Sequence, residues 1–443
     1  MTALGIPREN NSADVTRAMQ RWRQAAGPWL HPTPPYSRRE QRSREKAYDR
    51  ALGEVEHHTK HANRFAPAET QRRLTASFAR FAVLALDLPG PAIDVITTDF
   101  LHVGTELARW ARRFDQTLTT PDIVQACRNA WTACGLQPLL GAPLALTPPI
   151  LAYSLLYPYS DNYLDRKGTT RDDKLRFSQR FRGRLRGEPL TPQGNQEVSI
   201  WALVGLIENH FPRHRYPGVH QSLLAIHNAQ EESLAQLHAG ENCPEHELLR
   251  ISCFKGGTSV LADAWLVHGA LTAQQIRFAF DWGVLLQLGD DLQDIREDLE
   301  RGSSTLFTRA IHRRLPLDVL ALQLLNFGDM IAAEMDALPH GTRTHKDLLR
   351  VSWRSLVLMA VAQAHQYFTP ALLAQLEPCS PFRFSFLRAR RKKLEGKSGL
   401  FQRIFQILLL NEDETPCRLP DPHARRVLTP LVSPAAIAHD VTA

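Results

Sequence analysis

The segment LDVLALQLLNFGDMIAAEMDAL (317–338) carries apolar residues at every third or fourth position along its whole length. SLVLMAVAQAHQYF (355–368) repeats this pattern, and neither segment shows the period-2 alternation of a half-buried strand. Three-to-four spacing places apolar side chains along one face of an α-helix, where they can pack on a core. Similar segments fill most of the 443-residue chain, so the sequence predicts an all-α fold.

Composition divides the chain into three parts. Residues 1–65 are polar and rich in Arg, Glu and His, which predicts an N-terminal polar helical extension. Residues 66–376 hold the apolar helical segments, and we interpret them as the main helical domain. Residues 377–443 form a basic, proline-rich C-terminal segment that we expect to be partly helical. With 43% hydrophobic residues, the chain can bury a substantial core.

No run of about 18 apolar residues occurs, and the N-terminus lacks the basic and apolar regions of a secretory signal. We therefore expect a protein in the cytoplasm. RARRKK (388–393) is the densest basic run, and LEGKSGLFQRIFQILLL (394–410) follows it. This pair is compatible with a packed C-terminal helix, or with an element peripheral to a membrane. The six cysteines are scattered, which favours free thiols.

The formal net charge of +7 suits an anionic partner, whether diphosphate, lipid or nucleic acid. Nucleic acid is not expected, because the chain has no zinc-finger spacing, no RNP-like aromatic motif and no basic region joined to heptads. The oligomeric state cannot be read from the sequence.

A first carboxylate pair stands in DNYLD (161–165), close to the end of an apolar segment that begins after Thr147. Asp161 and Asp165 are four residues apart, so on a helix they lie almost on one line and can share a cation. Arg166 and Lys167, followed by glycine, are typical of a helix end. An isolated pair of this kind is also common on a solvated helix surface.

A second, richer cluster lies in GDDLQDIREDLERGSSTL (289–306). On one helix running from Thr272 to Gly302, its aspartates would fall within an arc of about 100°. These aspartates are Asp290, Asp291, Asp294 and Asp298. Carboxylates so crowded repel one another, and magnesium is a hard cation that commonly bridges carboxylates to phosphate. The alternative is surface charge paired with Arg296 and Arg301.

The second cluster resembles the second aspartate-rich motif of the squalene and phytoene synthase superfamily. The agreement includes Glu297, Arg301, Gly302 and Leu306, in addition to Asp294 and Asp298. DNYLD resembles the DxxxD first motif of the same group. DNYLDR and FKGGTSVLADAWLV (254–267) are most similar to the large, or class IB, terpene synthases of the tetraprenyl-β-curcumene synthase type.

This resemblance implies an isoprenoid-synthase helical bundle around a central cavity, with 66–376 as the catalytic domain. It also implies about three magnesium ions (Mg²⁺) held between Asp161 and Asp165 on one wall and the second cluster on the other. The expected reaction is ionisation of a linear prenyl diphosphate, with Asp161, Asp165, Asp294 and Asp298 as the catalytic residues.

Two further sets of side chains are expected around such a site. Cations that could contact the diphosphate are Lys255, which precedes two glycines that could bend a helix, and Arg166, Arg171, Lys174 and Arg301. Aromatic residues that could line an apolar cavity and stabilise a carbocation are Tyr153, Tyr157, Trp265, Phe278 and Trp282. Each aromatic residue is equally compatible with ordinary core packing.

Several functions remain open at this point. The leading hypothesis is a terpene synthase that cyclises a prenyl diphosphate or eliminates from it. A head-to-head condensing enzyme of the squalene or phytoene type is the alternative within enzymes, and a head-to-tail prenyltransferase comes third. From another class, the chain could be a non-catalytic helical interaction protein whose acidic clusters are surface patches.

Overall fold

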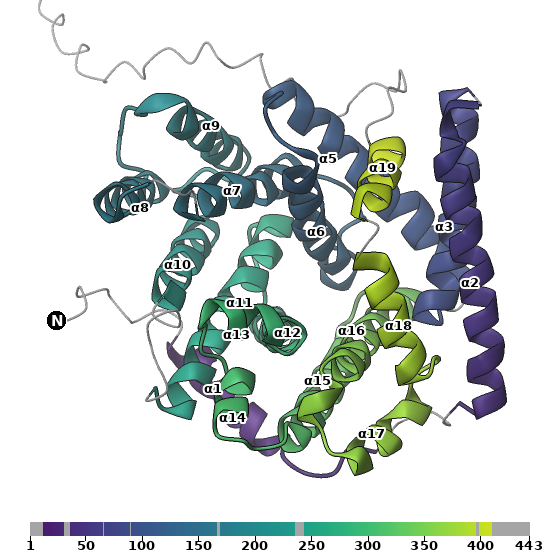
Figure 1. The fold of residues 1–443 in the computed structure, drawn as a ribbon. Coiled ribbons are helices and arrows are strands. Elements are labelled where there is room, and N and C mark those ends of the chain that lie inside the picture. The colour runs from purple at the N-terminus through teal and green to yellow at the C-terminus, as the bar shows by residue number, and fades with distance from the viewer. Residues whose placement is uncertain are drawn as a thin grey trace, which may run out of the picture.

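The computed structural model describes residues 12–30, 36–64, 66–88, 90–165, 169–234, 243–395 and 398–409. Within these ranges the chain forms helices and no strands, which confirms the all-α prediction (Figure 1). The part of the chain described here has no helix long and apolar enough to cross a membrane.

The first half of the chain forms the helices from α1 to α10. They are α1 (Ser12–Gln24), α2 (Arg38–Lys60), α3 (Pro67–Leu86), α4 (Gly90–Asp94), α5 (Leu101–Phe114), α6 (Thr120–Leu136), α7 (Pro148–Asp165), α8 (Arg171–Arg186), α9 (Gly194–His210) and α10 (Pro217–Ser233). Short turns are η1 (Ala62–Arg64), the π-helical η2 (Val95–Phe100) and η3 (Pro138–Leu140).

The second half contains the longest buried helices. They are α11 (Glu245–His268), α12 (Ala273–Gln293), α13 (Ile295–Arg301), α14 (Leu306–His312), α15 (Asp318–Ala337), α16 (Arg343–Gln363), α17 (Pro370–Leu376), α18 (Phe384–Glu395) and α19 (Ser398–Leu409). The turns η5 (His365–Tyr367) and η6 (Glu377–Cys379) flank α17.

Local sequence signals fix several helix ends. Thr272 and Gln275 form a capping box at the expected start of α12, and Gly302 ends α13 in the left-handed conformation. Thr119 and Asp122 form a capping box at the start of α6. Thr147 precedes α7 as predicted, but its buried Oγ1 has no hydrogen-bond partner, so α7 begins without a side-chain cap there.

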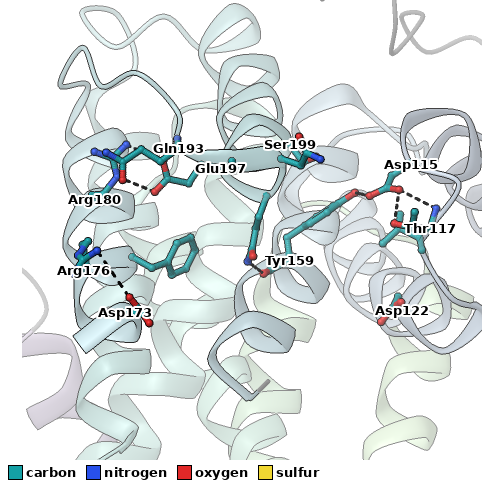
Figure 2. A pocket seen from close by; sticks show the side chains of 15 residues that line it. Asp115, Thr117, Asp122, Tyr159, Asp173, Arg176, Arg180, Gln193, Glu197 and Ser199 are labelled. Atoms are coloured by element: carbon teal, nitrogen blue, oxygen red, sulfur yellow. Dashed lines mark hydrogen bonds and ion pairs between the residues drawn. The ribbon is translucent and has the colours of Figure 1, made fainter. Parts of the chain in front are cut away.

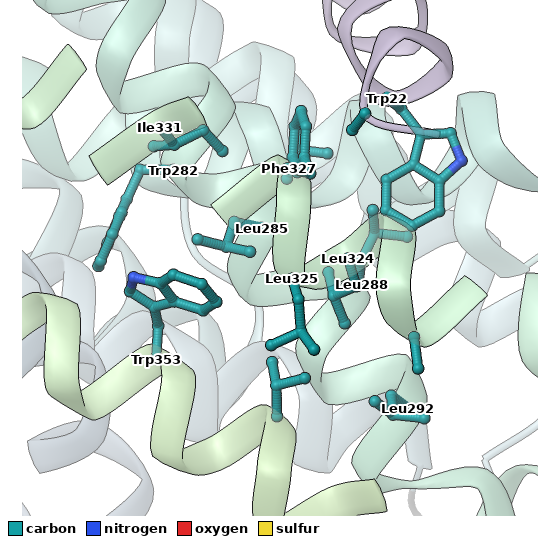
Figure 3. Close-up of a cluster of buried hydrophobic side chains, with 14 of the residues drawn as sticks. Trp22, Trp282, Leu285, Leu288, Leu292, Leu324, Leu325, Phe327, Ile331 and Trp353 are labelled. Atoms are coloured by element: carbon teal, nitrogen blue, oxygen red, sulfur yellow. The ribbon is translucent and has the colours of Figure 1, made fainter. Parts of the chain in front are cut away.

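Helix α12 lies at the centre of the larger hydrophobic core and packs on α1, α11, α15 and α16 (Figure 1). Leu285, Leu288 and Leu292 repeat at helical spacing on α12 and are fully buried among Leu324, Phe327 and neighbouring side chains (Figure 3). Burying each such side chain contributes about 1.5–3 kcal/mol to folding. The apolar spacing read from the sequence therefore builds the core that holds α12 in place.

Two glycines in FKGGTS have a packing role that differs from the expectation. Helix α11 runs through Gly256 and Gly257 without interruption. A Cβ on Gly256 would lie 2.5 Å from the backbone oxygen of Gly283 on α12, and one on Gly257 would lie 2.4 Å from the ring of Phe280. The glycines thus let α11 and α12 approach closely, and the backbone they expose meets a helix rather than a ligand.

The polar N-terminal extension contributes to the main core. Trp22 of α1 is 4% exposed and meets Phe327 edge to face, with 5.8 Å between ring centroids (Figure 3). Arg17 and Arg21 of α1 both pair with Asp281, whose side chain is completely buried, and Arg21 also pairs with Glu334. Helix α1 is therefore anchored on α12 and α15 by both apolar and ionic contacts.

The C-terminal apolar segment forms α19, which packs on α3, α5 and α6. Ile404 and Leu408 are buried in the second hydrophobic core, whereas Gln402, Arg403 and Gln406 are exposed. The apolar face of α19 is thus covered by protein. Of the two expectations for 394–410, the described part of this segment matches the packed helix.

Candidate metal and diphosphate site

The second carboxylate cluster lies where α12 ends and α13 begins. The helix is not continuous from Thr272 to Gly302 as expected, because Asp294 adopts φ −93° and ψ 11° between α12 and α13. The interruption is small, since the Asp294 amide still donates to the Asp290 carbonyl at 2.8 Å and the Asp298 amide to the Asp294 carbonyl at 2.8 Å. The four aspartates therefore stay on adjacent turns.

Asp291 is fixed to the neighbouring helix. It is buried, one oxygen accepts from Ser252 Oγ of α11 at 2.8 Å, and the other accepts from Gln287 Nε2 at 2.8 Å. Burial raises the pKa of Asp291, and these two hydrogen bonds oppose that rise. Both of its oxygens are therefore already engaged, which distinguishes Asp291 from the other three members of the cluster.

The other three carboxylates are crowded and retain solvent contact. Burial, together with the charges of Asp291 and Asp294, raises the pKa of Asp298 to about 7. Burial, opposed by Arg128 and reinforced by Asp291 and Asp294, raises the pKa of Asp290 to about 6. Part of the Asp290 residue is exposed to solvent, although protein atoms surround most of its carboxyl group. A cation placed among these groups would lower each pKa.

Cations of α11 and α13 border the cluster. Lys255 of α11 is half-buried and lies within electrostatic range of Asp290, Asp291 and Asp298. Arg301 acts in the same way on Asp294 and Asp298. Arg296 instead pairs with Glu300 at 3.1 Å, so it does not serve as the surface partner that the alternative interpretation required.

Arg128 is a member of this group that the sequence did not reveal. It is an exposed residue of α6, and its charge opposes the raised pKa values of Asp290 and Asp294. No local motif marks it, because it stands more than a hundred residues from the cluster and only the packing of α6 on α11 brings it near. Ser252, which holds Asp291, was missed for the same reason.

The first motif lies at the end of α7. The side chains of Asp161 and Asp165 lie outside the described residues, although α7 itself extends to Asp165. Positions 161 and 165 follow Ser154 by seven and eleven residues, so helix periodicity places them on the face of α7 that carries Ser154. Asn129 of α6 donates to Ser154 Oγ at 3.2 Å and to Asp263 of α11 at 3.5 Å. This face of α7 therefore turns toward α6 and α11.

Among the remaining predicted diphosphate contacts, only Lys174 has a side chain within the described residues. Arg166 and the side chain of Arg171 lie outside the described residues. Lys174 is one turn before Ser178 on α8, and Ser178 Oγ lies 3.3 Å from His227 Nε2 of α10. Lys174 thus occupies the face of α8 that packs on α10, away from α12.

The predicted cavity residues are distributed over both hydrophobic cores. Phe278 and Trp282 stack with 5.9 Å between centroids and are nearly fully buried in the core around α12. Tyr153 is buried in the second core, and the half-buried Trp265 packs against Gly218 of α10. The side chain of Tyr157 lies outside the described residues. In this structure Phe278 and Trp282 contribute to core packing.

A pocket of about 630 Å³ lies between α7, α8, α9 and the turn after α5 (Figure 2). Arg180 and Glu197 form a two-pronged ion pair in it, with distances of 2.8 and 2.7 Å, and Tyr159 donates to Asp115 at 2.7 Å. Tyr159 stands on a different face of α7 from Ser154. Among the described side chains, none of the predicted site residues lines this pocket.

Across the described ranges, no three His, Cys, Asp or Glu side chains are arranged to hold a metal ion. Two of the six predicted ligands, Asp161 and Asp165, are outside that search. In comparisons with known proteins, no family model, no curated protein and no solved structure matches this chain.

Proposed function

We propose that this chain is a magnesium-dependent class I terpene synthase, which ionises a linear prenyl diphosphate and cyclises it or eliminates from it. The observation that carries the proposal is the group of Asp290, Asp294 and Asp298, crowded at the α12–α13 junction and bordered by Lys255 and Arg128. The carboxylates provide a surface for a metal ion, and the neighbouring cations provide one for an anion.

The donor set suits a divalent metal ion. Carboxylate oxygens are the ligands that Mg²⁺ prefers, and a bound cation would relieve the repulsion that raises the pKa values of Asp290 and Asp298. Asp161 and Asp165 would complete the ligand set, which is supported by their position on the face of α7 toward α6 and α11. When bound, magnesium neutralises the diphosphate and stabilises its departure.

The chain's own residues have distinct tasks in this proposal. Lys255 and Arg128 bind the diphosphate oxygens as cationic hydrogen-bond donors. Ser252 and Gln287 hold Asp291, which in turn fixes α12 against α11 and orients the neighbouring ligands. The close contact of α11 and α12 at Gly256 and Gly283 keeps Lys255 at the level of the cluster.

The test is incubation of the purified chain and magnesium with single prenyl diphosphates of increasing chain length. Release of diphosphate and gas chromatography of the products are measured. A terpene synthase gives a hydrocarbon from one substrate molecule, whereas a head-to-head enzyme gives a product of summed carbon number. Absence of magnesium-dependent diphosphate release at every chain length would contradict the proposal.

A matched pair of variants separates the cluster from general surface charge. Asp298→Asn should reduce turnover by about 100-fold or more, a usual magnitude for losing one group that stabilises developing charge. Glu300→Gln removes a carboxylate two residues further along α13 that pairs with Arg296 at the exposed surface, and it should leave turnover unchanged. Equal losses of turnover in both variants would show that the cluster has no special role in the reaction.

A further inference from the structure

A second, smaller pocket of about 360 Å³ lies behind the α12–α13 junction, where α16, η5 and α18 meet it. Helices α16 and α18 lie side by side at this position (Figure 1). The pocket is lined by Gln293, Ile295, Arg296, Gln363, Ala364, Gln366, Tyr367, Arg388, Arg391 and Lys392. Its basic residues include half of the RARRKK run, to which the proposed reaction gives no role.

The lining is strongly one-sided in charge. Four of its side chains are cationic, namely Arg296, Arg388, Arg391 and Lys392, and no carboxylate is among the lining residues. Within the described part of the chain, Arg388 and Lys392 form no ion pair. The other lining side chains add three amides and a phenol, all of which can donate hydrogen bonds.

Part of this positive charge is compensated by the protein. Arg296 pairs with Glu300, Arg391 donates to Gln363 Oε1, and the charge of Arg391 acts on Asp294. The carboxyl-terminal end of α16, at Gln363 and Ala364, adds the partial negative charge of a helix terminus. Arg388 and Lys392 lie on one side of α18 and one turn apart, and neither has a carboxylate partner among the described residues.

We propose that this pocket binds a small phosphate-bearing anion, with Arg388 and Lys392 as its main contacts. Arginine matches the oxygens of a phosphate group in a forked geometry, and a nearby lysine adds a point charge. The volume lies at the lower end of the range for small-molecule sites, which fits a diphosphate or a single headgroup and not a long polymer. This inference stands independently of the proposed terpene synthase activity.

The test is calorimetric titration of the full chain with inorganic diphosphate, in the presence of a chelator that suppresses metal-dependent binding. Replacing both Arg388 and Lys392 by Gln should weaken binding by about tenfold or more, the effect of losing a hydrogen bond to a charged group. Lys393→Gln is the matched control, because Lys393 is an exposed neighbour that does not line the pocket.

A second arm distinguishes a soluble anion from a lipid headgroup. Flotation with phosphatidylcholine vesicles, with and without phosphatidic acid, measures headgroup binding. Binding to phosphatidic acid vesicles that is lost in the double variant assigns the site to a lipid headgroup. Binding of inorganic diphosphate without any vesicle binding assigns the site to a soluble ligand. Thermal unfolding of each variant confirms that the fold is retained. Absence of binding to both probes, or equal binding by the double variant, overturns the proposal.

Discussion

Asp298 and Asp290 make the stability of the metal-free chain depend on pH. The pKa of Asp298 rises from 3.8 to about 7 in the folded chain, and that of Asp290 rises to about 6. Between pH 4 and pH 7 the folded chain therefore holds protons that the unfolded chain has lost. The stabilising contribution of these groups is present below their unfolded pKa and is lost as the pH rises through the folded values.

We expect the metal-free chain to gain stability from Asp298→Asn at pH 8, with little change at pH 5, because the amide removes a repelled charge that exists only at the higher pH. Thermal unfolding in a chelating buffer measures this. In the Glu300→Gln variant, the difference between the melting temperatures at pH 8 and pH 5 should be the same as in the parent chain. A melting temperature for Asp298→Asn below that of the parent chain at pH 8 would show that the carboxylate is stabilised there, contrary to this argument.

Gly283 allows a test of the contact that positions Lys255. An added Cβ would lie 2.1 Å from the Gly256 carbonyl oxygen, a distance that only separation of α11 and α12 could relieve. Gly283→Ala should therefore lower the free energy of unfolding by about 1–3 kcal/mol. On the same helix, a Cβ at Gly289 meets nothing within 4 Å, so Gly289→Ala should stabilise the chain by up to about 1 kcal/mol. Chemical denaturation of both variants gives the comparison.

At the scale of single helices, α1 shows how a polar segment can belong to a core. Trp22→Ala should cost about 3–5 kcal/mol, because it removes a buried ring packed on Phe327. Arg23→Ala, at an exposed position of the same helix, should cost far less. Denaturant unfolding measures both. If the two variants were equally stable, α1 would not be docked in solution as it is here.

The sequence predicts helix ends that depend on neighbouring residues. It does not predict helix ends that depend on packing against other helices. The helix start at Thr272 and the glycine stop at 302 need only neighbouring residues, and both are confirmed. The interruption at Asp294 has no local breaker, since no glycine or proline stands there. The glycines of FKGGTS were interpreted as a bend because the sequence does not show that Gly283 lies opposite them.

At the scale of the whole molecule, the all-α fold followed from apolar spacing, because that spacing is repeated in most segments. The grouping of the second cluster with Lys255 depends on the pairing of α11 with α12, and Arg128 joins through α6. Contacts between segments that are distant in the chain do not produce a recognisable residue spacing in a single sequence. The basic pocket was equally unpredictable, since its lining comes from α12, α13, α16 and α18.

Whether the two aspartate-rich motifs form one site is a question about the whole molecule, and a double-mutant cycle answers it. If Asp161 and Asp298 hold the same magnesium ions, either single change to Asn should remove most of the thermal stabilisation that magnesium provides, and the double variant should lose little more. If the motifs are separate surface patches, as in a non-catalytic interaction protein, the two losses should add. The stabilisation is measured as the change in melting temperature between chelator and excess magnesium at pH 8, where Asp298 is ionised. The measurement needs no substrate, so it tests the shared metal site whatever the chain length of the prenyl diphosphate.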